Sequence, residues 1–244
     1  MTDSSPAALL LRSNPHWKLA VKNLRDLNRA HGTEAHTRAL NYASEYENSR
    51  GAMIVDVVAS RQRRYTTRVR NIVADWKSRN AEHTIAWLAS RPLQREKYGL
   101  SDNEVTTIHD VANRLCAFAS EQGLTAADAE DQLCRVWADR CGAFEHAPKL
   151  DPVVGSVKGI GLALFAYARM RSGADAIKPD TRVVKALRSL GFSIPDDPHA
   201  ALLVARAAAD EIGVSRLVLD QLLWWLDNED VPVTSRQAST KGQE

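Results

Sequence analysis

Four consecutive residues, Lys158-Gly159-Ile160-Gly161, form a candidate anion-binding turn because they place two glycines directly before an apolar run that starts at Leu162. Glycine permits positive φ angles and close backbone approach, and a helix that begins near Leu162 leaves its first N–H groups unpaired. Unpaired N–H groups at the start of a helix suit a phosphate oxygen. An ordinary loop is the alternative interpretation of the same glycine pattern.

Asp180 is a carboxylate that follows Pro179 and precedes an amphipathic run. This position predicts an N-cap, in which the side chain accepts hydrogen bonds from N–H groups of the first helical turn. A carboxylate is also the group that stabilises positive charge on a sugar when an N-glycosidic bond breaks, or that orients the attacking water. The structural and the catalytic role are compatible, and both stay open for Asp180.

The order of these features, Gly159-Ile160-Gly161, a buried helix and then Pro179-Asp180-Thr181-Arg182-Val183, resembles the helix-hairpin-helix (HhH-GPD) DNA glycosylase superfamily. In that superfamily the hairpin holds a DNA phosphate, and the aspartate, itself a helix cap, faces the sugar of a nucleotide flipped out of the duplex. The resemblance implies that Asp180 is the catalytic carboxylate. It also implies that phosphate is held by Lys158, Gly159, Ile160, Gly161 and Leu162.

A second stretch places five arginines in the ten residues from Arg61 to Arg70, between two helical patterns. A solvated basic face is one interpretation. However, Ser60-Arg61-Gln62 also resembles the first helix-turn-helix of the same superfamily, where an apolar helix ends in Ser-x-Gln and the glutamine is inserted into the duplex. The resemblance implies that Gln62 fills the gap left by a flipped base. Nearby phosphates would then be neutralised by Arg61, Arg63, Arg64 or Arg68.

Two departures from the superfamily pattern narrow the expected chemistry. Members that also cut the DNA strand place a lysine two residues beyond the second hairpin glycine, and this chain has Ala163 there, so the Schiff-base nucleophile is missing. Some members carry a four-cysteine iron–sulfur cluster after the aspartate, whereas no cysteine follows Asp180. We therefore expect hydrolysis by water with no cofactor and no metal site. A cation coordinated by hairpin carbonyls occurs in similar proteins and stays open here.

The elements that must position these residues are helices. Apolar residues recur at helical spacing within residues 17–27, 69–76, 105–118 and 217–226, and we find no convincing alternating strand. We predict an all-α fold, with connections at Arg91-Pro92, at residues 142–152 and at residues 193–198, where proline and glycine interrupt the pattern.

The resemblance further implies a two-lobed helical fold with a cleft between the lobes. A barrel-like lobe of residues 51–172 would end in the hairpin, and a second lobe would join residues 1–50 to residues 173–228, with Asp180 at the mouth of the cleft. Residues 229–244 are expected to form a flexible tail. The first fifty residues carry no motif, and Trp224 and Trp225 fit a core better than a base pocket.

The composition is that of a globular protein with an uneven charge. The 244 residues are 44% hydrophobic and 25% charged, with a net charge of +2, and are enough for a real core. Residues 151–192 carry seven Lys/Arg against three Asp, so the hairpin region is basic. Three widely spaced cysteines favour a reducing cytoplasm. The DNA-binding role implied by the resemblance would place the protein at the nucleoid in a bacterium. No export signal or bilayer-spanning segment is evident.

Together these features predict a monomeric, monofunctional DNA glycosylase of base-excision repair. It would bind double-stranded DNA, hydrolyse the N-glycosidic bond of a damaged or modified base, and leave an abasic site. Two other classes stay open: an inactive DNA-binding protein that keeps the fold, and a helical interaction protein in which Gly159-Ile160-Gly161 is merely a loop.

Overall fold

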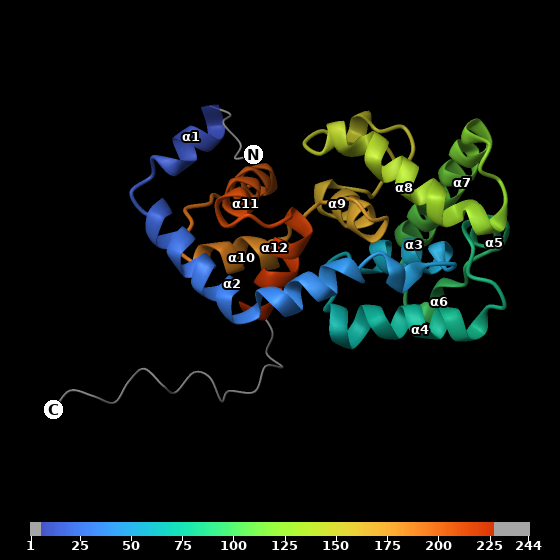
Figure 1. Ribbon diagram of the computed structural model, residues 1–244. Coiled ribbons are helices and arrows are strands. Elements are labelled where there is room, and N and C mark those ends of the chain that lie inside the picture. Colours follow the sequence, from blue (N-terminus) through green and yellow to red (C-terminus); the bar gives the residue numbers. More distant parts are fainter. Residues whose placement is uncertain (1–5, 227–244) are drawn as a thin grey trace.

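The computed structural model describes residues 6–226, and this part of the chain is helical without a β-strand (Figure 1). The all-α prediction is therefore confirmed. The α-helices are α1 (Pro6–Arg12), α2 (Trp17–Leu40), α3 (Arg50–Ala59), α4 (Arg70–Arg79), α5 (Ile85–Ser90), α6 (Arg95–Tyr98), α7 (Asp102–Gln122), α8 (Glu130–Arg140), α9 (Leu162–Arg171), α10 (Thr181–Ser189), α11 (Pro198–Ile212) and α12 (Arg216–Leu223). Short 3-10 turns occur at η1 (Ser44–Tyr46), η3 (Ala127–Ala129), η4 (Cys141–Phe144), η5 (Pro148–Leu150) and η6 (Trp224–Leu226), and a π-helical turn forms η2 (Tyr65–Val69). The predicted tail, residues 229–244, lies outside the described residues.

The described residues bury their apolar side chains in two separate cores. The first core is drawn from residues 46–176, and the second joins residues 17–35 to residues 177–223. Figure 1 shows the corresponding halves, with α1, α2, α10, α11 and α12 on one side, α3 to α8 on the other, and α9 between them. The lobe boundaries given by the resemblance, at residues 50/51 and 172/173, stay a prediction.

Two helices are buried on nearly all sides and carry the first core. All ten residues of α3 are buried, and so are all residues of α9 from Leu164 onward. A helix that is apolar all round must lie inside the protein. The fully buried Arg50 ties the two helices together, because it forms an ion pair with Asp131 at 2.5 Å and donates to the Arg171 carbonyl at 2.8 Å.

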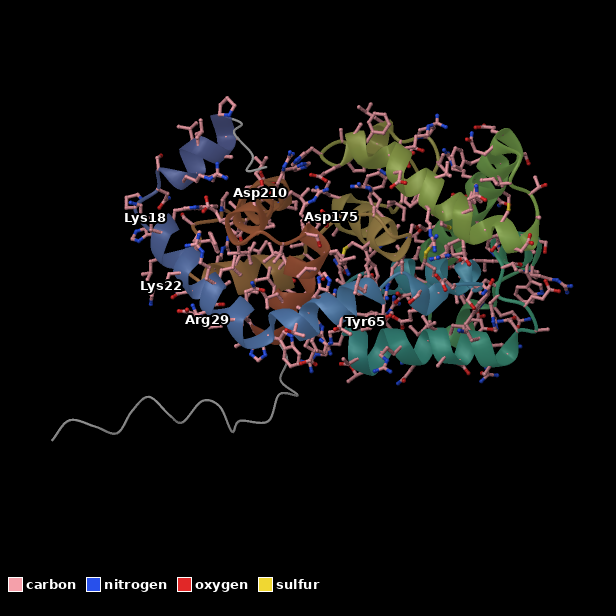
Figure 2. All side chains as sticks on the ribbon, viewed as in Figure 1. Lys18, Lys22, Arg29, Tyr65, Asp175 and Asp210 are labelled. Atoms are coloured by element: carbon pink, nitrogen blue, oxygen red, sulfur yellow. The ribbon has the colours of Figure 1, made fainter. Side chains whose placement is uncertain are left out.

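The first fifty residues, which carry no motif, supply a wall of the second core. Helix α2 packs against α11 and α12, and its buried Trp17 meets Phe192 edge-on with ring centroids 5.0 Å apart. The opposite face of α2 is exposed and basic at Lys18, Lys22 and Arg29, along the outer edge of the molecule in Figure 2.

The predicted connections lie between helices, and the three cysteines are free thiols. Arg91-Pro92 separates α5 from α6, residues 142–152 contain η4 and η5, and residues 193–198 link α10 to α11. Burial raises the pKa of both Cys134 and Cys141 to about 12, as is typical of core thiols. Trp224 and Trp225 are only partly buried and share the guanidinium of Arg38, at 4.3 and 5.0 Å from their ring centroids.

Candidate functional site

The two hairpin glycines have different backbone conformations. Gly159 has a φ of 95°, and an added Cβ would lie 2.5 Å from both Arg61 Nη2 and Thr107 Oγ1. Gly161 is extended, with φ −100° and ψ −177°, and an added Cβ would meet no atom within 4 Å. Of the two glycines, only Gly159 uses the positive φ that glycine permits, and only Gly159 requires glycine for its own conformation.

The turn is held through its carbonyl groups. Arg61 Nη2 donates to the Gly159 carbonyl at 2.6 Å, and Thr107 Oγ1 donates to the Lys158 carbonyl at 3.0 Å. The carbonyls of Val157 and Ile160 accept from Lys149 Nζ at 3.0 and 2.9 Å. Four consecutive carbonyls thus accept from side chains, while the buried Ile160 side chain anchors the turn in the first core. The turn is therefore held by side chains from three other segments of the chain.

Helix α9 starts from this turn without a side-chain cap. Its N-cap is Gly161, and its first helical hydrogen bond runs from Phe165 N to the Gly161 carbonyl at 2.9 Å. The N–H groups before Phe165 have no partner within the helix. Lys158, Gly159 and Gly161 are exposed beside them, and Leu162 is partly buried against the second core. This helix start combines backbone N–H groups that have no partner within the helix with an exposed lysine nearby.

Asp180 uses its two carboxylate oxygens differently. Oδ1 accepts from Val183 N at 3.1 Å and caps α10, so the N-cap prediction is confirmed. Oδ2 lies 3.6 Å from Lys178 Nζ, and the two side chains are 26% and 17% exposed. The Lys178 ammonium also donates to Ser60 Oγ at 3.3 Å and lies 4.5 Å from the centroid of the Tyr167 ring. One oxygen of Asp180 therefore caps the helix, and the other lies near the Lys178 ammonium.

The turn after α3 links the hairpin to Asp180. Ser60 contacts the ammonium that pairs with Asp180, and the next residue, Arg61, donates to the hairpin. Gln62 follows with a φ of 54° and an exposed side chain. A left-handed conformation is uncommon for a residue with a Cβ and costs on the order of 1–3 kcal/mol. Three segments that are far apart in the sequence thus meet in one place.

The arginines that follow have separate surroundings. Arg63 forms a bidentate ion pair with the buried Glu104, with one N–O distance of 2.9 Å, and donates to the Ala59 carbonyl at 3.1 Å. Burial alone would raise the pKa of Glu104, but the hydrogen bonds from Arg63 and Ser101 outweigh burial and lower it. Arg64 is exposed and has no ion pair among residues 6–226. The DNA-binding role of Arg61, Arg63 and Arg64 stays a prediction, and two of the three have partners inside the protein.

Sequence reasoning missed a buried cluster behind Lys178. The Arg171 side chain is 2% exposed, pairs with Asp56 at 3.3 Å, and donates to the Tyr65 hydroxyl at 2.6 Å. The Tyr167 hydroxyl donates to Asp56 Oδ2 at 2.6 Å. Burial raises the pKa of Asp56, Tyr65 and Tyr167. In Figure 2, Tyr65 lies near the neighbouring ends of α2 and α4, between the two halves of the molecule. The signal in the sequence was Asp56, the one charged residue in the otherwise apolar stretch of residues 51–59.

A second missed residue, Asp220 of α12, fixes the segment that carries Asp180. Its buried Oδ1 accepts from Lys178 N at 3.3 Å and from Arg182 Nη2 at 3.1 Å. Burial raises the pKa of Asp220, and the nearby Arg182 opposes this shift. Asp220 therefore holds the backbone just before Asp180 and a side chain just after it.

The polar pocket of about 410 Å³ on the other side of α9 contains none of these residues. Its lining includes Glu145, Asp175, Asp210 and Arg216, and Figure 2 shows Asp175 and Asp210 on the upper side, away from Tyr65. Glu145 forms ion pairs with both Arg216 and Arg169 there. We assign this pocket no role in the candidate site.

Comparison of the chain with protein-family models, curated proteins and solved structures found no match. Among residues 6–226, no three His, Cys, Asp or Glu side chains are grouped as metal ligands. No helix in the same range has the length and apolar character needed to cross a membrane.

Proposed function

We propose that this protein is a monofunctional DNA glycosylase with a two-lobed helix-hairpin-helix fold. The observation that carries the proposal is the meeting of three segments: Ser60-Arg61-Gln62, the hairpin at residues 157–161, and Asp180. Ser60 lies 3.3 Å from the ammonium that pairs with Asp180, and Arg61 donates to the hairpin at 2.6 Å. The resemblance to the glycosylase superfamily assigns a different part of base excision to each of these segments.

The hairpin is the proposed phosphate site. Its carbonyls already accept hydrogen bonds from side chains, so the N–H groups before Phe165, which have no partner within the helix, are the backbone groups left for a ligand. Donors at a helix N-terminus, reinforced by the helix dipole, favour an anion. Lys158 adds an exposed positive charge to the same turn. A DNA phosphate fits this combination, and its contact carries no sequence information.

Asp180 is the proposed catalytic carboxylate. Its Oδ1 is engaged by Val183 N, which fixes the orientation of the side chain, and Oδ2 takes no part in the cap. When the N-glycosidic bond breaks, positive charge develops on the sugar, and a fixed carboxylate oxygen nearby stabilises that charge or holds the attacking water. A cap that holds one oxygen thus preorganises the other for chemistry.

Gln62 is the proposed wedge. A base that leaves the stack opens a gap in the duplex, and a side chain inserted there offsets part of the stacking that is lost. Gln62 is exposed, and its left-handed backbone conformation lies between Arg61 and Arg63, both of which are fixed by partners in the protein. The exposed Arg64 would then contact the flanking phosphates.

The experiment that tests the proposal is incubation with duplexes that carry different base lesions, followed by alkali to break the strand at abasic sites. We expect breaks only after alkali, and only for the lesion that the enzyme removes. Asp180→Asn is the matched control, because asparagine keeps the helix cap without the charge. Tight binding of duplexes with no base released from any of them would contradict the catalytic proposal and favour a DNA-binding protein.

A further inference from the structure

The hairpin carries a fixed positive charge on its carbonyl side. Lys149, in η5, places its ammonium 3.0 Å from the Val157 oxygen and 2.9 Å from the Ile160 oxygen. The two carbonyls belong to the turn itself, since Ile160 N donates to the Val157 oxygen at 3.1 Å. One side chain therefore bridges the first and the last carbonyl of the turn.

The backbone that carries Lys149 is fixed by its neighbours. The buried Asp151 accepts from Val154 N at 2.8 Å and from Gly155 N at 2.7 Å. Gly155 lies so close to η5 that an added Cβ would be 1.9 Å from the Pro148 oxygen. Residues 148–151 and 153–157 are thus packed backbone to backbone. Lys149 reaches the hairpin from a rigid base, so its ammonium is preorganised for the two carbonyls.

The resemblance left open whether a metal cation is bound at the hairpin. The contacts of Lys149 do not fit such a cation. A hard cation would require backbone carbonyl oxygens as ligands, and the oxygens of Val157 and Ile160 accept from an ammonium. Thr107 and Arg61 hold the carbonyls between them, at 3.0 and 2.6 Å. A metal ion near these oxygens would also be repelled by Lys149, since like charges at a few ångströms oppose each other.

We propose that Lys149 is the internal cation of the hairpin and a positioning residue for its proposed phosphate site, so that the turn needs no bound metal ion. The ammonium supplies the positive charge that a coordinated cation would otherwise provide, and its hydrogen bonds to the Val157 and Ile160 oxygens take the place of coordination bonds. It differs from a bound ion in being covalently attached and present at every salt concentration. The shape of the turn should therefore be independent of which monovalent cation is in solution.

The test compares thermal unfolding in potassium chloride and in choline chloride at equal concentration, because choline is too large to be coordinated by the turn. Wild type should unfold at the same midpoint in both salts. Lys149→Met keeps the chain length but removes the charge and both hydrogen bonds, so its midpoint should fall by about 4–8 °C in choline chloride. Potassium should restore part of this loss by occupying the vacated carbonyls. Lys158→Met removes a charge from the same turn and should show no potassium-specific recovery.

A wild-type midpoint that rises in potassium relative to choline would reveal a bound cation and overturn the proposal. So would Lys149→Met with the wild-type midpoint in choline, or with an equal loss in both salts. If Lys149→Met does not fold, the comparison of wild-type unfolding midpoints in the two salts still tests the proposal. Lys149→Arg keeps the positive charge, so its midpoint should be the same in both salts. The measurement uses no DNA, so its outcome is separate from that of the proposed function. A parallel loss of duplex affinity in Lys149→Met, partly restored by potassium, would connect the two.

Discussion

Helices α9 and α10 follow each other in the chain but start in opposite ways. α9 begins after Gly161, has no side-chain cap, and leaves its first N–H groups without a partner in the helix, near the exposed Lys158. α10 begins after Asp180, whose carboxylate caps Val183 N at 3.1 Å. Both helix dipoles present partial positive charge at the N-terminus. At α9 this charge is open to an anion from outside, whereas at α10 the protein supplies the anion itself.

The comparison shows how one chain places two different electrostatic sites close together. The side chain of a capping aspartate would repel a phosphate, so a phosphate site requires a start such as Gly161, which has no side chain. A catalytic carboxylate requires a fixed orientation, which the cap provides for Asp180. Ser60 and Arg61 connect the two starts, because Ser60 contacts Lys178 beside Asp180 and Arg61 contacts the hairpin.

The largest effect is expected for Asp180→Asn, which keeps the cap of α10 and removes its charge. Base release should fall by about 10³-fold or more, because the developing charge on the sugar loses its carboxylate. Stability should change little, since asparagine is as good an N-cap as aspartate. Single-turnover base release and thermal unfolding measure the two quantities. A nearly silent substitution would make Asp180 a cap only.

Substitutions of the two glycines before α9 test two different roles. Gly159 is required for the backbone conformation, and Gly161 is required for contact with the proposed ligand. Gly159→Ala should cost on the order of 1–3 kcal/mol of stability, because its φ of 95° and its contacts with Arg61 and Thr107 leave no room for a Cβ. Gly161→Ala should stay within about 0.5 kcal/mol of wild type. It should nevertheless weaken duplex binding, because the added methyl stands beside the proposed phosphate donors. Gly161→Ala with unchanged affinity would remove this glycine from the interface.

Substitutions of Arg63 and Arg64 test whether the arginines of this basic run stabilise the fold or bind DNA. Arg63→Ala leaves Glu104 buried without its ion-pair partner and should cost on the order of 3 kcal/mol. Arg64→Ala should leave stability unchanged and lower the log–log slope of duplex affinity against salt by about 0.9. Denaturant unfolding and binding at several salt concentrations give both values. Arg64→Ala with the wild-type slope would contradict a phosphate contact at Arg64.

The Arg63–Glu104 ion pair should also make the stability of the folded protein depend on pH. The pKa of Glu104 is lowered in the folded protein, so the contribution of the pair is complete above the ordinary pKa of a glutamate. It is lost as the pH falls below that value and through the folded-state pKa. The stability difference between wild type and Arg63→Ala should therefore be full at neutral pH and narrow in acid.

The last prediction is that no change will be seen when a covalent intermediate is sought, because we expect no Schiff base to form between the protein and the DNA sugar. The resemblance places Ala163, near the start of α9, at the position of the superfamily nucleophile, and Lys178 is the amine beside Asp180. The Lys178 ammonium is engaged by Asp180, by Ser60 and by the Tyr167 ring, whereas attack on a sugar requires a free neutral amine. Borohydride added during turnover should trap no protein–DNA adduct. An adduct that disappears in Lys178→Ala would keep the enzyme class but replace the mechanism.

The sequence alone determined the features that depend on neighbours along the chain. Helical periodicity predicted the all-α fold, and the Pro-Asp-Thr order predicted the cap at Asp180, because caps and helices are made by residues a few positions apart. The glycine pattern located the turn, although only the structure separated Gly159 from Gly161. That difference depends on the approach to Gly159 of Arg61, from the turn after α3, and of Thr107, from α7.

Only the tertiary structure decided which charged side chains meet. In the sequence, nothing distinguishes one arginine of residues 61–70 from another. In the structure, Arg61 donates to the hairpin, Arg63 pairs with Glu104, and Arg64 is exposed. Lys149 and the Arg171 cluster could not be predicted, since their partners lie on other segments and a long flexible side chain carries no periodic signal. Pairings of this kind depend on how α3, α7 and α9 pack in the first core, which fixes the distances between residues remote in the chain.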